Sequence, residues 1–152
     1  MEWSCKKCGT TDTNLRYPSG KMNKCMDCQR WYNVTVNSKR KRKYKKGPEL
    51  NITEEEFLNW CNSQERKCDY CGIKEVDLKN AGLLSSIGLP VYALGIDRID
   101  SDKGYDIARE GGPLLDNIVF CCYACNKAKG DVFSYDEMKL IGESISKVWR
   151  GR

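Results

Sequence analysis

Histidine is absent from all 152 residues of this chain. The imidazole side chain is the one that enzymes use most often as a general base near neutral pH. Its absence excludes every mechanism that needs an imidazole. Any acid–base chemistry must therefore use another side chain.

Long apolar runs are also lacking. The best apolar stretch, residues 81–96, is interrupted by Gly88 and Pro90 and is shorter than the roughly 20 residues that a membrane-spanning helix needs. The first seven residues are polar and do not form a secretory signal. We therefore expect no membrane partner and an intracellular, reducing compartment, in which thiolates persist as metal ligands.

Cysteine, in contrast, is abundant, with ten residues, eight of which form four CxxC pairs. A secreted disulfide protein is one interpretation, but cysteines in this spacing bind metal more readily than they bridge each other. Two four-cysteine sets, each typical of a structural zinc ion, are predicted. The first set is Cys5, Cys8, Cys25 and Cys28, and the second is Cys68, Cys71, Cys122 and Cys125. Whether Cys121 or Cys122 is the ligand stays open, and Cys61 is expected to be a buried core thiol.

The net charge of +5 is a mild excess, but the positive charges are clustered. Residues 39–46 carry seven positive charges in eight positions. Such a run is typical of a phosphate-facing segment or of a disordered arm. The predicted phosphate contacts are Lys39, Arg40, Lys41, Arg42, Lys43, Lys127 and Lys129.

The length suits one ordinary domain plus a small module. We expect an α+β protein with an N-terminal four-cysteine zinc ribbon at 1–37, a basic linker at 38–52 and a main domain at 53–152 that holds the second zinc. In the ribbon, residues 14–17 are predicted as a strand and 28–37 as a short helix. Trp31 and Tyr32 are expected in the core.

Two capping boxes predict helix starts in the main domain, Thr53 with Glu56 and Ser134 with Glu137. The first helix should end near residue 62 and bury Phe57, Leu58, Trp60 and Cys61. Residues 74–80 are predicted as a short helix. The last helix carries an apolar stripe that is either core or a partner face, at Met138, Ile141, Ile145 and Val148.

Residues 93–99 and 117–122 are predicted as strands, and a helix should start at Ala124. Asp97 on the first strand and Asn126 on this helix offer two oxygen ligands, which suit Mg²⁺ or Mn²⁺ at a phosphate. Arg98 and the two lysines of the helix could hold flanking phosphates. Each feature alone has an ordinary explanation, such as a surface ion pair or a helix cap. Bracketed by CxxC pairs, they predict a metal centre that hydrolyses phosphodiesters.

Three segments resemble the HNH (ββα-metal) nucleases: 95–98 (GIDR), 116–118 (DNI) and 122–130 (CYACNKAKG). The resemblance implies a ββα-metal nuclease core with two structural zinc ions and one catalytic Mg²⁺ or Mn²⁺ per chain. It also implies a homodimer, in a bacterium or encoded by a phage, that acts on double-stranded DNA. The dimer would cut both strands of an A/T-rich palindrome and distort the DNA severely.

Typical members of that family place a histidine general base after the metal-binding residue, where this chain has Arg98. Arginine cannot accept a proton at working pH. The resemblance implies that Tyr70, between the cysteines of a knuckle, replaces the histidine as base or nucleophile, and that Asn117 braces the loop between the strands. A free tyrosine has a pKa of about 10, which is high for a base or nucleophile. We expect Arg98 and the metal to favour the phenolate form of Tyr70. The ordinary alternative is a tyrosine that merely packs on the zinc site.

Two other functions stay open. One is the same chemistry in a homing or nicking enzyme of a phage or mobile element. The other is a non-catalytic zinc module that binds nucleic acid. The target sequence does not follow from the residues, because base readout depends on which side chains reach the grooves.

Overall fold

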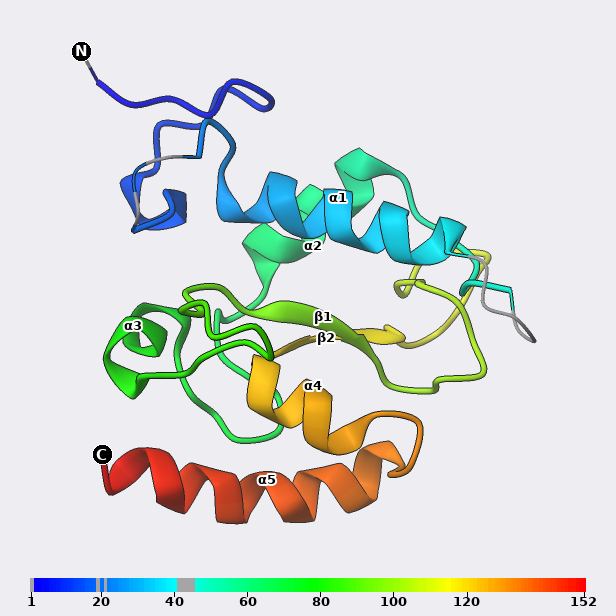
Figure 1. Ribbon diagram of the computed structural model, residues 1–152. Coiled ribbons are helices and arrows are strands. Elements are labelled where there is room, and N and C mark those ends of the chain that lie inside the picture. The colour runs from blue at the N-terminus through cyan, green and yellow to red at the C-terminus, as the bar shows by residue number, and fades with distance from the viewer. Residues whose placement is uncertain (1, 19, 21, 41–45) are drawn as a thin grey trace.

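A two-stranded antiparallel hairpin lies at the centre of the protein, with helices on both sides (Figure 1). The computed structural model describes residues 2–18, 20, 22–40 and 46–152. Helices α1 and α2 cover one side of the hairpin, and α4 and α5 lie on the other side. This mixture of helices and a small sheet confirms the predicted α+β class.

The N-terminal segment folds around its cysteines with little regular structure before α1. The strand predicted at 14–17 is wrong, because Thr13–Leu15 form a 3-10 turn, η1. The side chain of Asp12 caps this turn by accepting a hydrogen bond from the backbone N–H of Asn14 at 2.9 Å. A short polar side chain of this kind competes locally with extended structure.

Helix α1 spans Met26–Lys39 and is longer at both ends than predicted. Trp31 and Val34 lie in the main hydrophobic core together with Phe57 of α2. Tyr32 is 51% exposed, so its predicted burial is wrong. Consecutive helical residues point about 100° apart, and only one of this aromatic pair can face the core.

Helix α2 spans Glu54–Ser63 and begins with the predicted capping box. The hydroxyl of Thr53 accepts from the backbone N–H of Glu56 at 3.2 Å, and the Glu56 carboxylate accepts from the Thr53 N–H at 2.7 Å. Phe57, Trp60 and Cys61 are buried, which confirms the predicted stripe and the buried thiol. Leu58 is partly buried and packs against this core.

The predicted helix at 74–80 is a 3-10 turn, η2 (Glu75–Asp77), that continues into a single turn of helix, α3 (Leu78–Ala81). The predicted strands form the hairpin of β1 (Gly95–Arg98) and β2 (Ile118–Cys121). Their register places Asp97 opposite Val119. Helix α4 (Tyr123–Lys129) follows β2 after a single residue, so hairpin and helix form a compact ββα unit.

Helix α5 spans Tyr135–Arg150 and starts with the second predicted capping box. Met138 is fully buried, whereas Val148 is 52% exposed. The first half of the apolar stripe is therefore core, and its end is open to solvent. Within the described part of the chain, no helix is long and apolar enough to cross a membrane.

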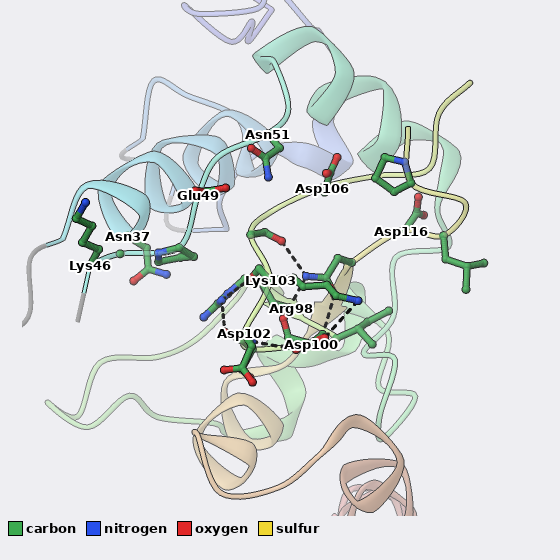
Figure 2. A pocket seen from close by; sticks show the side chains of 18 of the residues that line it. Asn37, Lys46, Glu49, Asn51, Arg98, Asp100, Asp102, Lys103, Asp106 and Asp116 are labelled. Atoms are coloured by element: carbon green, nitrogen blue, oxygen red, sulfur yellow. Dashed lines mark hydrogen bonds and ion pairs between the residues drawn. The ribbon is translucent and has the colours of Figure 1, made fainter. Parts of the chain in front are cut away.

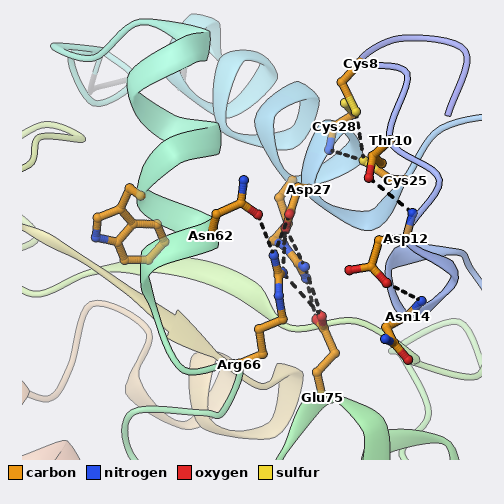
Figure 3. A network of polar contacts seen from close by, with 12 residues as sticks. Cys8, Thr10, Asp12, Asn14, Cys25, Asp27, Cys28, Asn62, Arg66 and Glu75 are labelled. Atoms are coloured by element: carbon orange, nitrogen blue, oxygen red, sulfur yellow. Dashed lines mark hydrogen bonds and ion pairs between the residues drawn. The ribbon is translucent and has the colours of Figure 1, made fainter.

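A buried group of charges connects the N-terminal part to the hairpin (Figure 3). The guanidinium of Arg30 on α1 donates to Asp27, also on α1, and to both carboxylate oxygens of Glu75. It also donates to the backbone oxygen of Leu94, just before β1, at 2.8 Å. Arg66 binds both oxygens of Asp27 from the other side, at 2.8 and 2.7 Å. Buried charges are tolerated when they are paired in this way.

Candidate active site and zinc clusters

The first four cysteines form a cluster that fits a zinc ion. The Sγ atoms of Cys5, Cys8, Cys25 and Cys28 all lie within 4.8 Å of one another. The Cys5–Cys28 and Cys8–Cys25 separations are 3.9 and 3.7 Å. Sulfurs about 2.3 Å from a tetrahedral zinc are separated by roughly 3.8 Å, whereas a disulfide needs about 2.05 Å.

The second cluster joins Cys68 and Cys71 to Cys122 and Cys125, and all four are buried. The Cys71 and Cys122 sulfurs are 3.7 Å apart. Cys122, not Cys121, belongs to this cluster. The thiol of Cys121, at the end of β2, instead donates to the backbone oxygen of Cys122 at 3.3 Å. Two four-cysteine sites compatible with zinc are thus present.

Tyr70 lies on the knuckle between Cys68 and Cys71, which three backbone hydrogen bonds hold. Gly72 and Asp69 donate to the backbone oxygens of Cys68 and Phe120, and Cys68 donates to Ile73, each at 2.9 Å. The bond to Phe120 fixes the knuckle against β2. From this position the Tyr70 hydroxyl donates to Oδ2 of Asp97 at 2.6 Å.

Lys129 completes this cluster from the last turn of α4. Its ammonium group donates to the same Asp97 oxygen at 2.7 Å and to the backbone oxygen of Arg98 at 2.5 Å. It also lies 5.8 Å from the centre of the Tyr70 ring. The side chain is 1% exposed, and in this structure it is directed toward Asp97 and Tyr70. The sequence predicts Lys129 only as a phosphate contact and misses its contact with Asp97. The one sequence feature that points to this contact is the spacing of one helical turn between Asn126 and Lys129.

Burial, followed by the hydrogen bond to Asp97 and the negative charge of that carboxylate, raises the pKa of Tyr70 well above its usual value of 10. Tyr70 is therefore a neutral phenol in this structure. The sequence predicts that a neighbouring arginine and a metal favour the phenolate. In the protein alone, the hydrogen-bond partner of the phenol is a carboxylate, which favours the neutral form.

Arg98 is directed away from this cluster. Adjacent residues of a strand project to opposite faces, and Arg98 follows Asp97 on β1. Its guanidinium donates to the backbone oxygens of Ser101 and Lys103 at 2.5 and 2.7 Å. It also lies 5.7 Å from the Tyr105 ring. The cation beside Tyr70 is thus Lys129.

Asn117 holds the turn between the two strands. Its side-chain oxygen accepts from the N–H of Asp100 at 2.9 Å. Its side-chain nitrogen donates to the backbone oxygens of Asp100 and Gly104, at 3.2 and 2.8 Å. Every bond of this amide side chain goes to the loop backbone, which is the geometry of a brace.

Asp97 on β1 and Asn126 on α4 are the residues that the sequence predicts as oxygen ligands of a divalent cation. Asn126 is exposed on α4, one turn before Lys129, and its side chain has no hydrogen bond to any of the described residues. Both hydrogen bonds to the Asp97 side chain use Oδ2, which leaves Oδ1 without a partner in the described part of the chain. A carboxylate and an amide oxygen beside solvent fit the donor preference of Mg²⁺ or Mn²⁺.

A cleft of about 1140 Å³ lies at the turn end of the hairpin (Figure 2). Arg98 and Asn117 line it, together with Arg40 and Lys46, which belong to the predicted basic run. Lys41, Arg42 and Lys43 fall outside the described residues. Lys39 and Lys127 are exposed. Tyr70, Asp97 and Lys129 are not among the lining residues, so this cleft and the buried cluster are separate.

No family model matches the sequence, and the search of curated proteins finds no match. A solved structure does match over nearly the whole chain. It is that of the HNH restriction endonuclease PacI, described as rare-cutting and as perturbing DNA. The two chains are 31% identical, the match covers 98% of this chain and 96% of that one, and the TM-score is 0.78. With its ββα unit and paired four-cysteine clusters, this chain belongs to the HNH endonuclease family that includes PacI.

Proposed function

We propose that this protein is a type II restriction-like endonuclease that hydrolyses phosphodiester bonds of duplex DNA. The observation that carries the proposal is the 2.6 Å hydrogen bond from the Tyr70 hydroxyl to Asp97, in a chain that has no histidine. This bond joins the Tyr70 oxygen to a carboxylate on the strand that, in this family, carries a metal-binding residue. The similarity to PacI over the full chain supports the same reaction class.

Asp97 and Asn126 are the residues that would hold a catalytic Mg²⁺ or Mn²⁺. Such an ion, when bound, stabilises the negative charge that develops on the phosphate and on the leaving oxygen. The ammonium group of Lys129 donates to Oδ2 of Asp97 at 2.7 Å and would help to orient this carboxylate.

Tyr70 would act as base or as nucleophile, with Asp97 positioned to accept its proton. As a base, the phenolate removes a proton from the water that attacks phosphorus. As a nucleophile, its oxygen forms the bond to phosphorus while the bond to the leaving sugar oxygen breaks, and water then hydrolyses the phosphotyrosine. In both routes the leaving oxygen takes up a proton. The raised pKa of Tyr70 means that binding of cation and DNA must lower it before either route can start.

Other residues would bind the DNA or hold the loop between the strands in place. Lys39, Arg40 and Lys127 are exposed and suit contacts to phosphates, as do Lys41, Arg42 and Lys43 of the same basic run. Arg98 would contact phosphate from the cleft, and Asn117 would keep the turn between the strands in place. The zinc module at 1–37 and the linker at 38–52 would add DNA contacts to the nuclease domain at 53–152. The protein would act as a homodimer on an A/T-rich palindrome, because each subunit then cuts one strand of a symmetric site.

Cleavage of plasmid DNA tests the proposal. The protein should linearise DNA in Mg²⁺ or Mn²⁺ and not in EDTA. Tyr70→Phe should lower the cleavage rate by about 10³-fold or more, as expected for loss of a base or nucleophile, while DNA binding in EDTA stays within about twofold of the original. Tyr32→Phe is the matched control, because this half-exposed tyrosine lies on α1.

Near-normal cutting by Tyr70→Phe would remove Tyr70 from the mechanism, and binding without any cutting by the original protein would support the non-catalytic alternative. Sequencing of cut genomic ends should show symmetric double-strand breaks, whereas single nicks would favour the homing or nicking role. A covalent protein–DNA adduct on denaturing gels would identify the nucleophile route. Sedimentation with a DNA site should show two chains per duplex.

A further inference from the structure

We propose that helix α5 aims Tyr70, with Gly142, Tyr135 and Lys139 as positioning residues. The proposal rests on the catalytic role of Tyr70 given above. Zinc would hold the two cysteines of the knuckle, but no bond to zinc fixes the two residues between them. Helix α5 contacts both of these intervening residues and also Cys71.

Gly142 is the point of closest approach. An ideal Cβ on this buried residue would overlap the carbonyl oxygen of Tyr70 and lie 2.5 Å from its carbonyl carbon, closer than real Cβ atoms come to other atoms. Glycine is unfavourable in the middle of a helix, so local helix propensity does not explain it. Its presence allows the helix backbone to touch the backbone of Tyr70 directly. Any larger side chain must push the helix and the knuckle apart.

Asp69, the residue before Tyr70, is fixed by two side chains of α5. The hydroxyl of Tyr135 donates to Oδ2 of Asp69 at 2.6 Å. The ammonium group of Lys139 donates to the backbone oxygen of Asp69 at 2.6 Å and lies 3.5 Å from the same carboxylate. Asp69 is therefore held at both its side chain and its carbonyl group, directly before Tyr70.

Two aromatic contacts complete the arrangement. The ring of Tyr135 lies 5.6 Å from the ring of Tyr70, tilted by 58°. Trp149, near the end of the helix, donates its indole N–H to the sulfur of Cys71 at 3.3 Å. Helix α5 thus contacts Asp69, Tyr70 and Cys71 in sequence. A reacting group that is displaced by about 1 Å can lose roughly 10²-fold in rate, so a helix that sets the position of the knuckle also sets the reaction rate.

Single-turnover cleavage by two variants tests this role. Gly142→Ala should lower the cleavage rate at saturating enzyme by about 10²-fold, because the helix must retreat from Tyr70. Tyr135→Phe adds no atoms and removes only the bond to Asp69, and should lower the same rate by about tenfold. In both variants the DNA dissociation constant should change less than about twofold, and the zinc content should match that of the original protein. Lys139→Arg keeps a donor for Asp69 and should cut faster than Lys139→Met.

Ser144→Ala, at an exposed position of the same helix, and Tyr32→Phe are the matched controls and should behave as the original. Unchanged cleavage by both Gly142→Ala and Tyr135→Phe would overturn the positioning role. So would a rate that falls only together with zinc content or DNA affinity, since that would mark a purely structural helix. Tyr70→Phe in the same assay separates the two proposals. If it cuts normally, the role of Tyr70 fails, whereas an inactive Tyr70→Phe beside fully active α5 variants refutes only the aiming role.

Discussion

The single side chain of Arg30 connects several elements of this protein. It is 3% exposed and neutralises Asp27 and Glu75, which are also buried. It also satisfies the backbone oxygen of Leu94. A single residue of α1 therefore fixes η2 and the start of β1.

Removing this guanidinium should destabilise the protein strongly. Arg30→Met leaves two buried carboxylates that share only Arg66 as a cationic partner among the described residues. Loss of one partner of a buried ion pair costs about 3–5 kcal/mol, and we expect a fall of that size in the free energy of unfolding, measured with denaturant. Lys103→Met removes an exposed pair with Asp100 and should cost less than about 1 kcal/mol. Equal effects of the two substitutions would contradict this account.

For single residues, the sets of metal-ligating cysteines are easier to predict from sequence than the side-chain contacts of Tyr70. The spacing of the cysteines is a chain-local signal, and it predicts both four-cysteine clusters. The choice of Lys129 over Arg98 beside Tyr70 depends on which face of β1 and which turn of α4 meet the knuckle. That is a property of packing, and no local pattern encodes it.

The start of helix α5 follows from local sequence, whereas the burial along its apolar stripe does not. Its capping box is predictable because Ser134 and Glu137 interact within one turn. The burial of its apolar stripe depends on packing against the Tyr70 knuckle, which lies more than 60 residues earlier in the chain. Helix orientation likewise decides the exposure of Tyr32, whereas the wrong assignment of 14–17 has a local cause, the cap that Asp12 provides.

The cap of α5 can be tested alone. Ser134→Ala removes the side-chain acceptor for the N–H of Glu137 and should lower the free energy of unfolding by about 1 kcal/mol at pH 7. Hydrogen bonds from Ser134 lower the pKa of Glu137. The contribution of its carboxylate is therefore present above the unfolded value of about 4.3 and is lost as pH falls through the folded value. Both proteins should lose this carboxylate contribution below about pH 4, because the backbone N–H that donates to Glu137 remains in Ser134→Ala. Ser144→Ala, which removes no cap, should not lower the free energy of unfolding.

For the whole molecule, the two cysteine clusters differ in what surrounds them. The second lies inside the main core, with α5 and both strands around it. The first has a small core of its own, formed by Leu15, Cys5, Cys25 and Cys28, with Trp3 and Leu58 packed against it. We expect a core of this size to need a bound metal ion for its stability.

Metal analysis should find two zinc ions per chain. Cys8→Ser should lower the value to one, expose the N-terminal segment to proteolysis and weaken DNA binding, while the ββα unit stays folded. Cys61→Ala removes a buried thiol that is not in either cluster and should keep both ions. A value of two in Cys8→Ser would mean that the first cluster holds zinc without this ligand.

The buried charges on α1 have a consequence for how such enzymes diversify. An N-terminal zinc ribbon looks like a cassette that recombination could exchange for another. Here the helix that closes the ribbon also carries Asp27 and Arg30, whose partners Arg66 and Glu75 belong to the nuclease half. A foreign ribbon that lacked these two residues would leave Glu75 buried without a full counter-charge, so any exchanged segment must also carry this pair if the fold is to keep its stability.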